Sequence, residues 1–137
     1  MKLDPSAFLA DPELIRALGD RSTPISCHED RVLFRQGDPP FRLYILTKGE
    51  VGLSMMSAAG KPVLSIKAAP GSILGLPGLI GNEPYTLTAI ARTGAELYFL
   101  NRDEFTALIQ SDPFLCLKVL QVLAAEVRSA RNLILQR

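Results

Sequence analysis

The chain has 137 residues, which suits one domain with a substantial core and is too short for two well-packed ones. Apolar residues make up 47% of it and charged residues 21%, a composition that excludes intrinsic disorder. The formal net charge of +1 provides no field that would draw the chain to nucleic acid or to an anionic membrane.

Cysteine usage and hydropathy point to a cytoplasmic protein. Only two cysteines occur, Cys27 and Cys116, and their isolation in the sequence excludes a disulfide framework and any CxxC motif. The N-terminus has no continuous apolar run and no stretch approaches a membrane-spanning length. We therefore expect no signal peptide and no membrane partner.

Two short helices are predicted at the start of the chain, within residues 5–18, where Asp11-Pro12 reads as a cap followed by a first turn. The texture then changes to short β-rich runs separated by glycine and proline, a regularity typical of a sandwich or barrel. The predicted strands lie at residues 32–34, 43–46, 51–56, 63–66, 87–90 and 95–100.

An unusual segment, residues 71–86, separates the two strand series. Its first fourteen residues contain four glycines and two prolines, too many turn residues for a strand. Glycine allows bare backbone to approach a ligand closely. One interpretation is a ligand cradle, and the other is a glycine-rich loop kept only for its backbone shape.

The chain ends in two predicted helices, the first capped by Asn101 and the second begun by Asp112-Pro113. Apolar residues of the second helix recur at spacings of four and three, as in a coiled-coil seam. This pattern predicts a homodimer, with packing of one apolar stripe on the barrel as the alternative. The seam consists of Cys116, Leu120, Leu123, Val127, Ala130 and Ile134.

This order of elements resembles the effector domain of the catabolite activator protein (CRP/FNR-like) family and the cyclic-nucleotide-binding modules of kinases and channels. The resemblance covers roughly residues 20–135. It does not include the helix-turn-helix domain of the family's transcription factors. It implies a mainly β fold with flanking α, a double-stranded β-helix (jelly-roll-like) barrel with N- and C-terminal helices. The matching landmarks are Val32-Leu33-Phe34-x-x-Gly37-Asp38, Leu43-Tyr44-Ile45-Leu46-x-x-Gly49-Glu50-Val51, Gly60, Gly71-x-x-x-Gly75, Gly81-x-Glu83-Pro84 and Leu97-x-x-Leu100-x-x-x-x-Phe105.

The resemblance also implies where a cyclic nucleotide would bind. In the family a glutamate binds the ribose and an arginine pairs with the phosphate, whereas this chain has Leu76 and Tyr85 at those positions. Each hydrogen bond to a charged group contributes about 1.5–3 kcal/mol, so we expect weak or altered ligand recognition. The candidate ligand-binding residues are Gly75, Leu76, Pro77, Gly78, Tyr85 and Thr86.

Catalytic and metal motifs are missing from the sequence. There is no Gly-x-Ser-x-Gly elbow, P-loop or His-Glu-x-x-His, and His28 is the single histidine. His28 beside Cys27 suggests a haem or metal ligand, but an exposed turn residue next to a buried thiol is the simpler interpretation. We expect no enzyme, no cofactor and no metal site.

The sequence thus predicts one domain: a helical segment at 1–22, a barrel at 23–101 and helices at 102–137. We expect a non-catalytic regulatory or sensor module, degenerate for cyclic AMP and cyclic GMP, that forms a homodimer and takes a small ligand or a protein partner. The alternatives are a ligand-free interaction module and the effector-binding fragment of a CRP/FNR-type transcription regulator. Direct nucleic-acid binding is not expected from a chain without a recognition helix.

Overall fold

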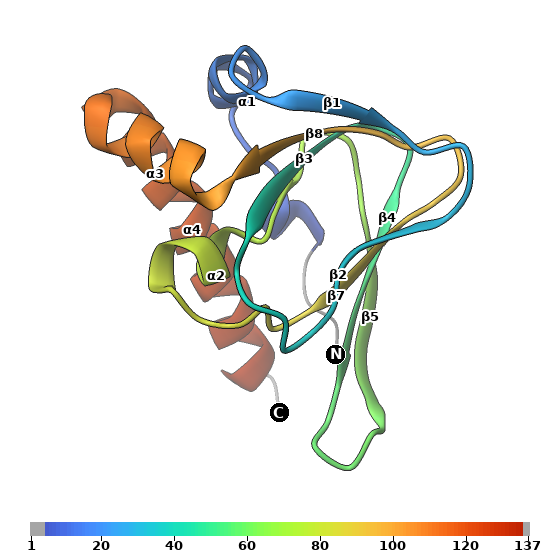
Figure 1. Ribbon diagram of the computed structural model, residues 1–137. Coiled ribbons are helices and arrows are strands. Elements are labelled where there is room, and N and C mark those ends of the chain that lie inside the picture. The colour runs from blue at the N-terminus through green and yellow to red at the C-terminus, as the bar shows by residue number, and fades with distance from the viewer. Residues whose placement is uncertain (1–4, 136–137) are drawn as a thin grey trace.

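The computed structural model describes residues 5–135, apart from the side chains of residues 7 and 130–135 (Figure 1). Strands occupy the middle of the chain and helices its two ends. The elements are η1 (Pro5–Phe8), α1 (Pro12–Gly19), β1 (Thr23–Ser26), β2 (Arg31–Phe34), β3 (Arg42–Lys48), β4 (Val51–Met56), β5 (Pro62–Ala68), β6 (Ile73–Leu74), α2 (Leu76–Gly81), β7 (Thr88–Ala91), β8 (Glu96–Asn101), α3 (Arg102–Ser111) and α4 (Pro113–Leu135).

The strands form two antiparallel four-stranded sheets, ordered β1-β8-β3-β6 and β2-β7-β4-β5. Figure 1 shows the sheets facing each other, with α2, α3 and α4 gathered along one side of them. This arrangement confirms the predicted jelly-roll-like fold with flanking helices.

The core is built differently in the two sheets. Four consecutive residues of β3, Leu43 to Leu46, are buried, so this strand is covered on both faces. In β4, by contrast, the buried residues Val51 and Leu53 alternate with more exposed ones, as in a sheet with one solvated face. The helices accordingly pack on the sheet that contains β3, with which α2 and α3 are in contact.

Acidic and amide side chains begin the helices as predicted. The Asp11 carboxylate accepts a hydrogen bond from the backbone N–H of Glu13 at 2.8 Å, at the start of α1. At α3, the Glu104 side chain accepts from the backbone N–H of Asn101 at 3.1 Å. Asp112 accepts from the N–H of Phe114, also at 3.1 Å, at the start of α4. Each contact satisfies a donor that has no partner within the helix.

Residues 9–11, here called the strap, join the sheets to α4. Leu9 forms an isolated antiparallel bridge with Ser72, and the N–H of Ala10 donates to the carbonyl of Gly71 at 2.9 Å. The Asp11 carboxylate pairs with the Nζ of Lys118 on α4 at 2.9 Å. The strap therefore contacts both the start of the 71–86 segment and the long C-terminal helix.

Two elements differ from the sequence-based expectation. β1 lies outside the strand series predicted from the sequence, because Pro24 cannot donate a ladder hydrogen bond; the strand is tolerated because it lies at the edge of its sheet. Residues 71–86 are not simply a loop, since they contain β6 and α2. A proline in the first turn of a helix loses no intrahelical bond, so Pro77 is compatible with α2.

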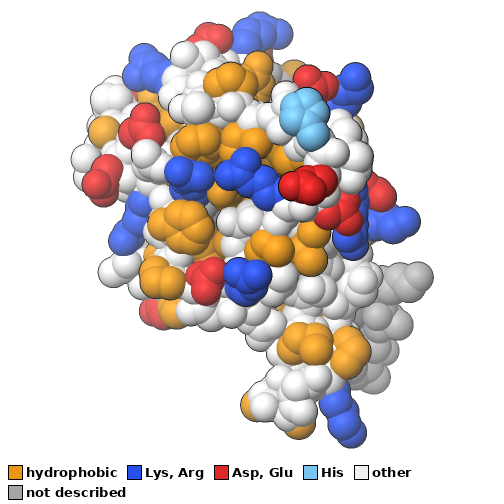
Figure 2. Space-filling view, turned by 45° about the vertical axis from the view of Figure 1, so that its right-hand side comes forward, with side chains coloured by type: hydrophobic (Ala, Val, Ile, Leu, Met, Phe, Trp, Pro, Cys, Tyr) orange, Lys and Arg blue, Asp and Glu red, His pale blue; other side chains and the backbone are white. Residues whose placement is uncertain are grey.

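The β4–β5 hairpin projects away from the helices at the bottom of Figure 1. It carries the exposed apolar side chains of Met56 and Val63. Figure 2 shows apolar side chains on this projection, and above it acidic and basic side chains intermixed rather than gathered by sign.

Candidate functional site

The predicted ligand segment, residues 71–86, packs against the connection between β2 and β3. The N–H of Tyr85 donates to the carbonyl of Asp38 at 3.0 Å, and the N–H of Gly37 donates to the carbonyl of Tyr85 at 2.8 Å. Both backbone groups of Tyr85 are therefore paired with residues 37–38. This pairing fixes where the Tyr85 side chain enters the protein.

The Tyr85 ring is surrounded by aromatic side chains. Its centroid lies 3.9 Å from that of Phe34, with the planes 15° apart, and 5.7 Å from that of Phe41 in an edge-on arrangement. Only 3% of Tyr85 is exposed. Aromatic pairs of this kind contribute about 0.5–1.5 kcal/mol beyond the burial of their area. The ring is thus part of the core.

The hydroxyl of Tyr85 has a full set of protein partners. It donates to the carbonyl of Arg42 at 2.6 Å and accepts from the backbone N–H groups of Arg42, at 2.9 Å, and Phe41, at 3.2 Å. A phenol offers one donor and two acceptor sites, so all three are used. Burial, the largest cause, raises the pKa of Tyr85 above its ordinary value, which keeps the hydroxyl neutral.

Glycines of the segment make room for this ring. A Cβ atom on Gly75 would lie 3.0 Å from Cε1 of Tyr85 and 3.1 Å from the carbonyl oxygen of Arg42. A Cβ atom on Gly78 would lie 3.6 Å from Cδ1 of the same ring and 3.0 Å from the carbonyl oxygen of Glu83. Gly75 also has a φ of +94°, which L-residues rarely adopt. Bare backbone therefore approaches a side chain of the protein itself.

The other residue at a key family position, Leu76, is completely buried, and Leu79 is 3% exposed. The two leucines lie one helical turn apart on α2 and belong to the hydrophobic core. An apolar side chain in this position has no group that could bind a ribose hydroxyl.

Of the predicted ligand residues, the structure brings Gly75, Gly78 and Tyr85 into contact and buries Leu76 beside them. Pro77 and Thr86 are exposed. The partners of Tyr85 were not among the predicted residues. No sequence signal identifies them, because Phe34 and the backbone of residues 41–42 lie far from Tyr85 along the chain.

Two arginines near these elements are already paired. The Arg42 guanidinium lies 4.0 Å from the centre of the Phe99 ring, and its Nε donates to the Asn101 side chain at 3.2 Å. Arg92 directly follows the C-terminal end of β7, whereas Tyr85 precedes the N-terminal end of that strand. The Arg92 guanidinium pairs with the Asp30 carboxylate at 3.3 Å.

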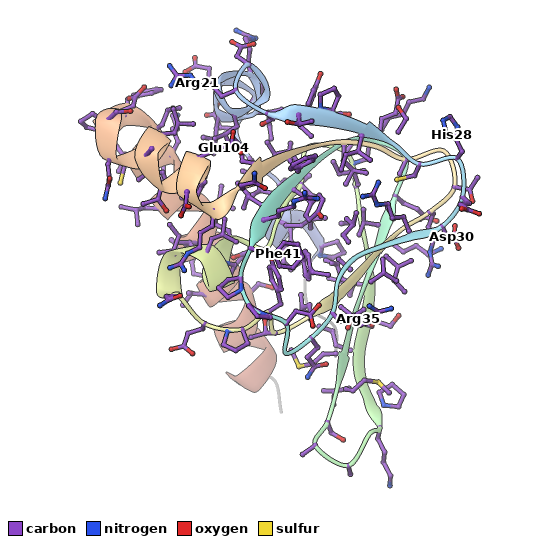
Figure 3. All side chains as sticks on the ribbon, viewed as in Figure 1. Arg21, His28, Asp30, Arg35, Phe41 and Glu104 are labelled. Atoms are coloured by element: carbon purple, nitrogen blue, oxygen red, sulfur yellow. The ribbon has the colours of Figure 1, made fainter. Side chains whose placement is uncertain are left out.

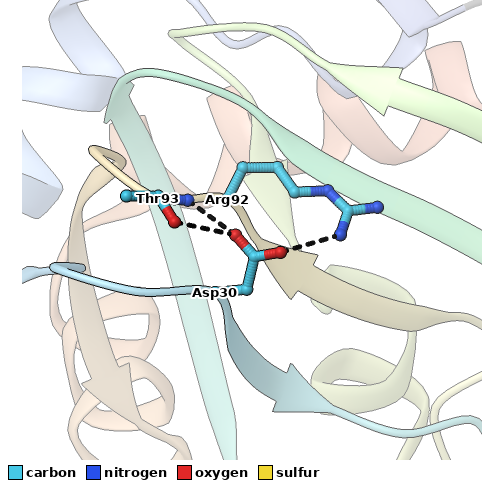
Figure 4. Close-up of polar contacts among 3 residues, drawn as sticks. All are labelled: Asp30, Arg92 and Thr93. Carbon is cyan, nitrogen blue, oxygen red and sulfur yellow. Dashed lines mark hydrogen bonds and ion pairs between the residues drawn. The ribbon is translucent and has the colours of Figure 1, made fainter.

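Figure 4 shows how Asp30 holds Arg92 and Thr93. Its carboxylate accepts from the N–H of Thr93 at 2.8 Å and from the Thr93 hydroxyl at 3.1 Å. These hydrogen bonds, with Arg92 contributing less, lower the pKa of Asp30. In Figure 3, Asp30 lies across the sheets from Phe41, on the side that carries His28. The Arg92 guanidinium is therefore paired with Asp30 and not with Tyr85 or the aromatic side chains around it.

The C-terminal helix α4 has two apolar faces. Leu115, Val119 and Val122 are at most 5% exposed and pack into the core. The opposite face, here called the outer stripe, is about half exposed and consists of Phe114, Leu117, Leu120 and Val127.

The predicted coiled-coil seam only partly coincides with the outer stripe. Leu120 and Val127 are exposed as a seam requires, but Leu123 is partly buried against the core. Ala130 and Ile134 have side chains outside the described residues.

Across residues 5–135, no single helix is long and apolar enough to cross a membrane. Nor do three or more His, Cys, Asp or Glu side chains come together as metal ligands would, among the side chains that are described.

Residues 24–112 match the family model described as "Cyclic nucleotide-binding domain". The chain belongs to this family. It is 26% identical over 122 residues to a CRP-like cAMP-activated global transcriptional regulator from Mycobacterium tuberculosis, covering 89% of this chain and 54% of that protein. It is also 29% identical over 98 residues to the acetyltransferase Pat from Mycolicibacterium smegmatis, covering 72% of this chain and 29% of the enzyme.

Among solved structures, the catabolite activator protein of Thermus thermophilus superposes with a TM-score of 0.78 at 24% identity. The match covers 96% of this chain and 62% of that structure, and it shows the fold. The chain thus spans about half the length, or less, of the curated relatives described here.

Proposed function

We propose that this chain is a non-catalytic, cytoplasmic regulatory module in which Tyr85 fills the place of a bound cyclic nucleotide. The observation that carries the proposal is the saturated hydroxyl of Tyr85, with three hydrogen bonds to the backbone of residues 41–42. A ligand in this place would have to break those bonds and separate the ring from Phe34. The burial of Tyr85 therefore supports a segment that packs into the core over one that forms an open cradle.

Charge leads to the same conclusion. A cyclic nucleotide carries a phosphodiester anion, which needs cationic or N–H donors when water is removed. Leu76 is fully buried and apolar, and Arg42 and Arg92 both have protein partners. Cyclic AMP or cyclic GMP would bind without the glutamate and the arginine that anchor the ribose and the phosphate in the family. We therefore do not expect micromolar affinity.

The relatives support a regulatory role. One is named as a transcriptional regulator and another as an acetyltransferase, and the match covers only 29% of the enzyme. A domain shared by such different proteins is better suited to control than to catalysis. The transcriptional and acetyl-transfer activities themselves are not assigned to this chain.

A second copy of this chain is the partner that we propose for the outer stripe of α4. The stripe is apolar and lies on one long helix, where its residues follow one another at spacings of three, three and seven, so two copies would bury it by side-by-side packing. A different protein with an apolar helix is the alternative partner.

Calorimetric titration with cyclic AMP and cyclic GMP tests the proposal. We expect no saturable heat up to about 1 mM ligand, the range of a binding free energy weaker than about 4 kcal/mol. The double variant Leu76→Glu/Tyr85→Arg restores both family anchors and serves as the comparison, provided that circular dichroism shows it folded. Micromolar binding of either nucleotide to the unaltered chain would contradict the proposal.

A further inference from the structure

Glu126 continues the buried face of α4. The residues of this helix that pack into the core, Leu115, Val119 and Val122, follow spacings of four and three, and the next position in that series is Glu126. A carboxylate therefore occupies a helix position that the preceding turns fill with leucine and valine. Charged side chains are almost never placed there without a partner.

The Glu126 carboxylate has no such partner among the described residues. Both of its oxygens are shielded from solvent, and neither accepts or donates a hydrogen bond there. Desolvation raises its pKa from an ordinary value of 4.5 to about 8. The carboxyl group is therefore mostly protonated at neutral pH while α4 lies in its place.

The charged groups on the elements that contact α4 do not compensate for this burial. η1 carries no charged residue, and on α4 itself Lys118 is paired with Asp11. Burial raises the pKa of Glu126, and no charge among the described side chains contributes to that shift. The charged residues of the contacting helices, with the remaining described one of α4, are Glu13 and Arg16 of α1, Arg102, Asp103 and Glu104 of α3, and Arg128.

We propose that Glu126 makes the docking of the C-terminal half of α4 dependent on its protonation, so that α4 is a proton-sensitive element. When the carboxyl group loses its proton, it favours water over the apolar interface, and this half of the helix separates from the body. The N-terminal half stays attached through Val119 and the pair of Lys118 with Asp11. This dependence of α4 on protonation holds whether or not a ligand binds near Tyr85.

The direction of the pH dependence of docking follows from the raised pKa of Glu126. A carboxyl group with a raised pKa in the docked state binds more protons there than in the released state, so docking weakens as the pH rises from 4.5 towards 8. The docking equilibrium changes about tenfold per pH unit within that window, or about a hundredfold between pH 5.5 and 7.5. A released helical segment of this length is marginal in water and exchanges its amide hydrogens.

Hydrogen exchange followed by mass spectrometry tests this dependence. After correction for intrinsic exchange rates, protection of peptides from residues 122–135 should fall about a hundredfold between pH 5.5 and 7.5, while β3 peptides keep theirs. Glu126→Gln removes the titration and keeps the shape, so its protection should not vary with pH. Glu29→Gln, at an exposed site in the connection between β1 and β2, should behave as the unaltered chain does.

Carbon NMR of the labelled glutamate carboxyl groups provides an independent readout. One resonance, absent from Glu126→Gln, should titrate near pH 8. Titration of that resonance at an ordinary glutamate pKa would overturn the inference. The same follows if Glu126→Gln shows the pH-dependent exchange of the unaltered chain, or if α4 protection is constant across the window.

Discussion

The aromatic rings of Phe34 and Tyr85 lie nearly parallel with their centroids 3.9 Å apart, and they join the end of β2 to the connection between α2 and β7. The stack is closed on its other edge by Phe41 and beneath by the bare backbone of Gly75. Four parts of the chain therefore meet at one side chain. Substitutions of Tyr85 should therefore alter the packing of all four parts.

Tyr85→Phe should destabilise the protein by about 1–3 kcal/mol, because it retains the stack but leaves the buried donors and acceptor of residues 41–42 without their partner. Equilibrium unfolding in urea measures the change. Tyr98→Phe is the control, since the Tyr98 hydroxyl has no hydrogen-bond partner in the described part of the chain; its effect should stay within about 0.5 kcal/mol. Equal effects of the two substitutions would contradict the assigned role of the hydroxyl.

Gly75→Ala should be costly for two separable reasons, a positive φ and a contact of 3.0 Å with the Tyr85 ring. Gly60→Ala provides the comparison, because Gly60 has a φ of +78° but no atom within 4 Å of the added Cβ. We expect about 1 kcal/mol from the backbone alone at Gly60, and about 1–3 kcal/mol more at Gly75 from overpacking. Urea unfolding of both variants checks the difference, which should be absent if the ring can move aside freely.

The ion pair of Asp11 with Lys118 should make stability depend on acid. The hydrogen bond from Lys118, the largest cause, lowers the pKa of Asp11 below its ordinary value of 3.8. A lowered carboxyl pKa contributes stability that is present above 3.8 and is lost as the pH falls through the folded-state value. Between pH 6 and pH 3, the unaltered chain should therefore lose more thermal stability than Asp11→Asn, which keeps the helix cap. Parallel losses would show that the pair contributes nothing.

Leu120→Glu should dissociate the proposed homodimer, because it places a charge in the middle of the exposed outer stripe of α4. Sedimentation velocity over a concentration series measures the effect. Val63→Glu introduces the same charge at an exposed position of the β4–β5 hairpin and should leave association unchanged. A monomeric unaltered chain at all concentrations would remove the second copy as partner.

Sequence patterns indicate a sandwich or barrel with flanking helices, because turn residues and short apolar runs mark the strands, and caps such as Asp11 and Asn101 mark the helices. The jelly-roll-like arrangement is what the family resemblance implies. Sequence patterns were insufficient where local preference and tertiary context disagree. β1 contains Pro24, and α2 is rich in glycine and proline, so neither resembles its own class of element. Edge position and core burial override those preferences.

The sequence also revealed the missing family anchors but not what replaces them. The substitution by Tyr85 is visible in the sequence, whereas its hydroxyl partners lie 43 and 44 residues away. For α4, an apolar seam was predicted, but the helix is apolar over more than one face. Periodicity alone could not separate the core-facing Leu115 and Val119 from the exposed Leu117 and Leu120.

The strap of residues 9–11 gives this small protein a short mechanical linkage. The backbone of Ala10 is tied to Gly71, and one residue later the Asp11 carboxylate is tied to Lys118. A displacement at either contact is transmitted to the other through the single peptide unit that joins Ala10 to Asp11. Trimming the chain back to residue 12 would therefore break both contacts, and it would also remove the packing of η1 on α4 and β5.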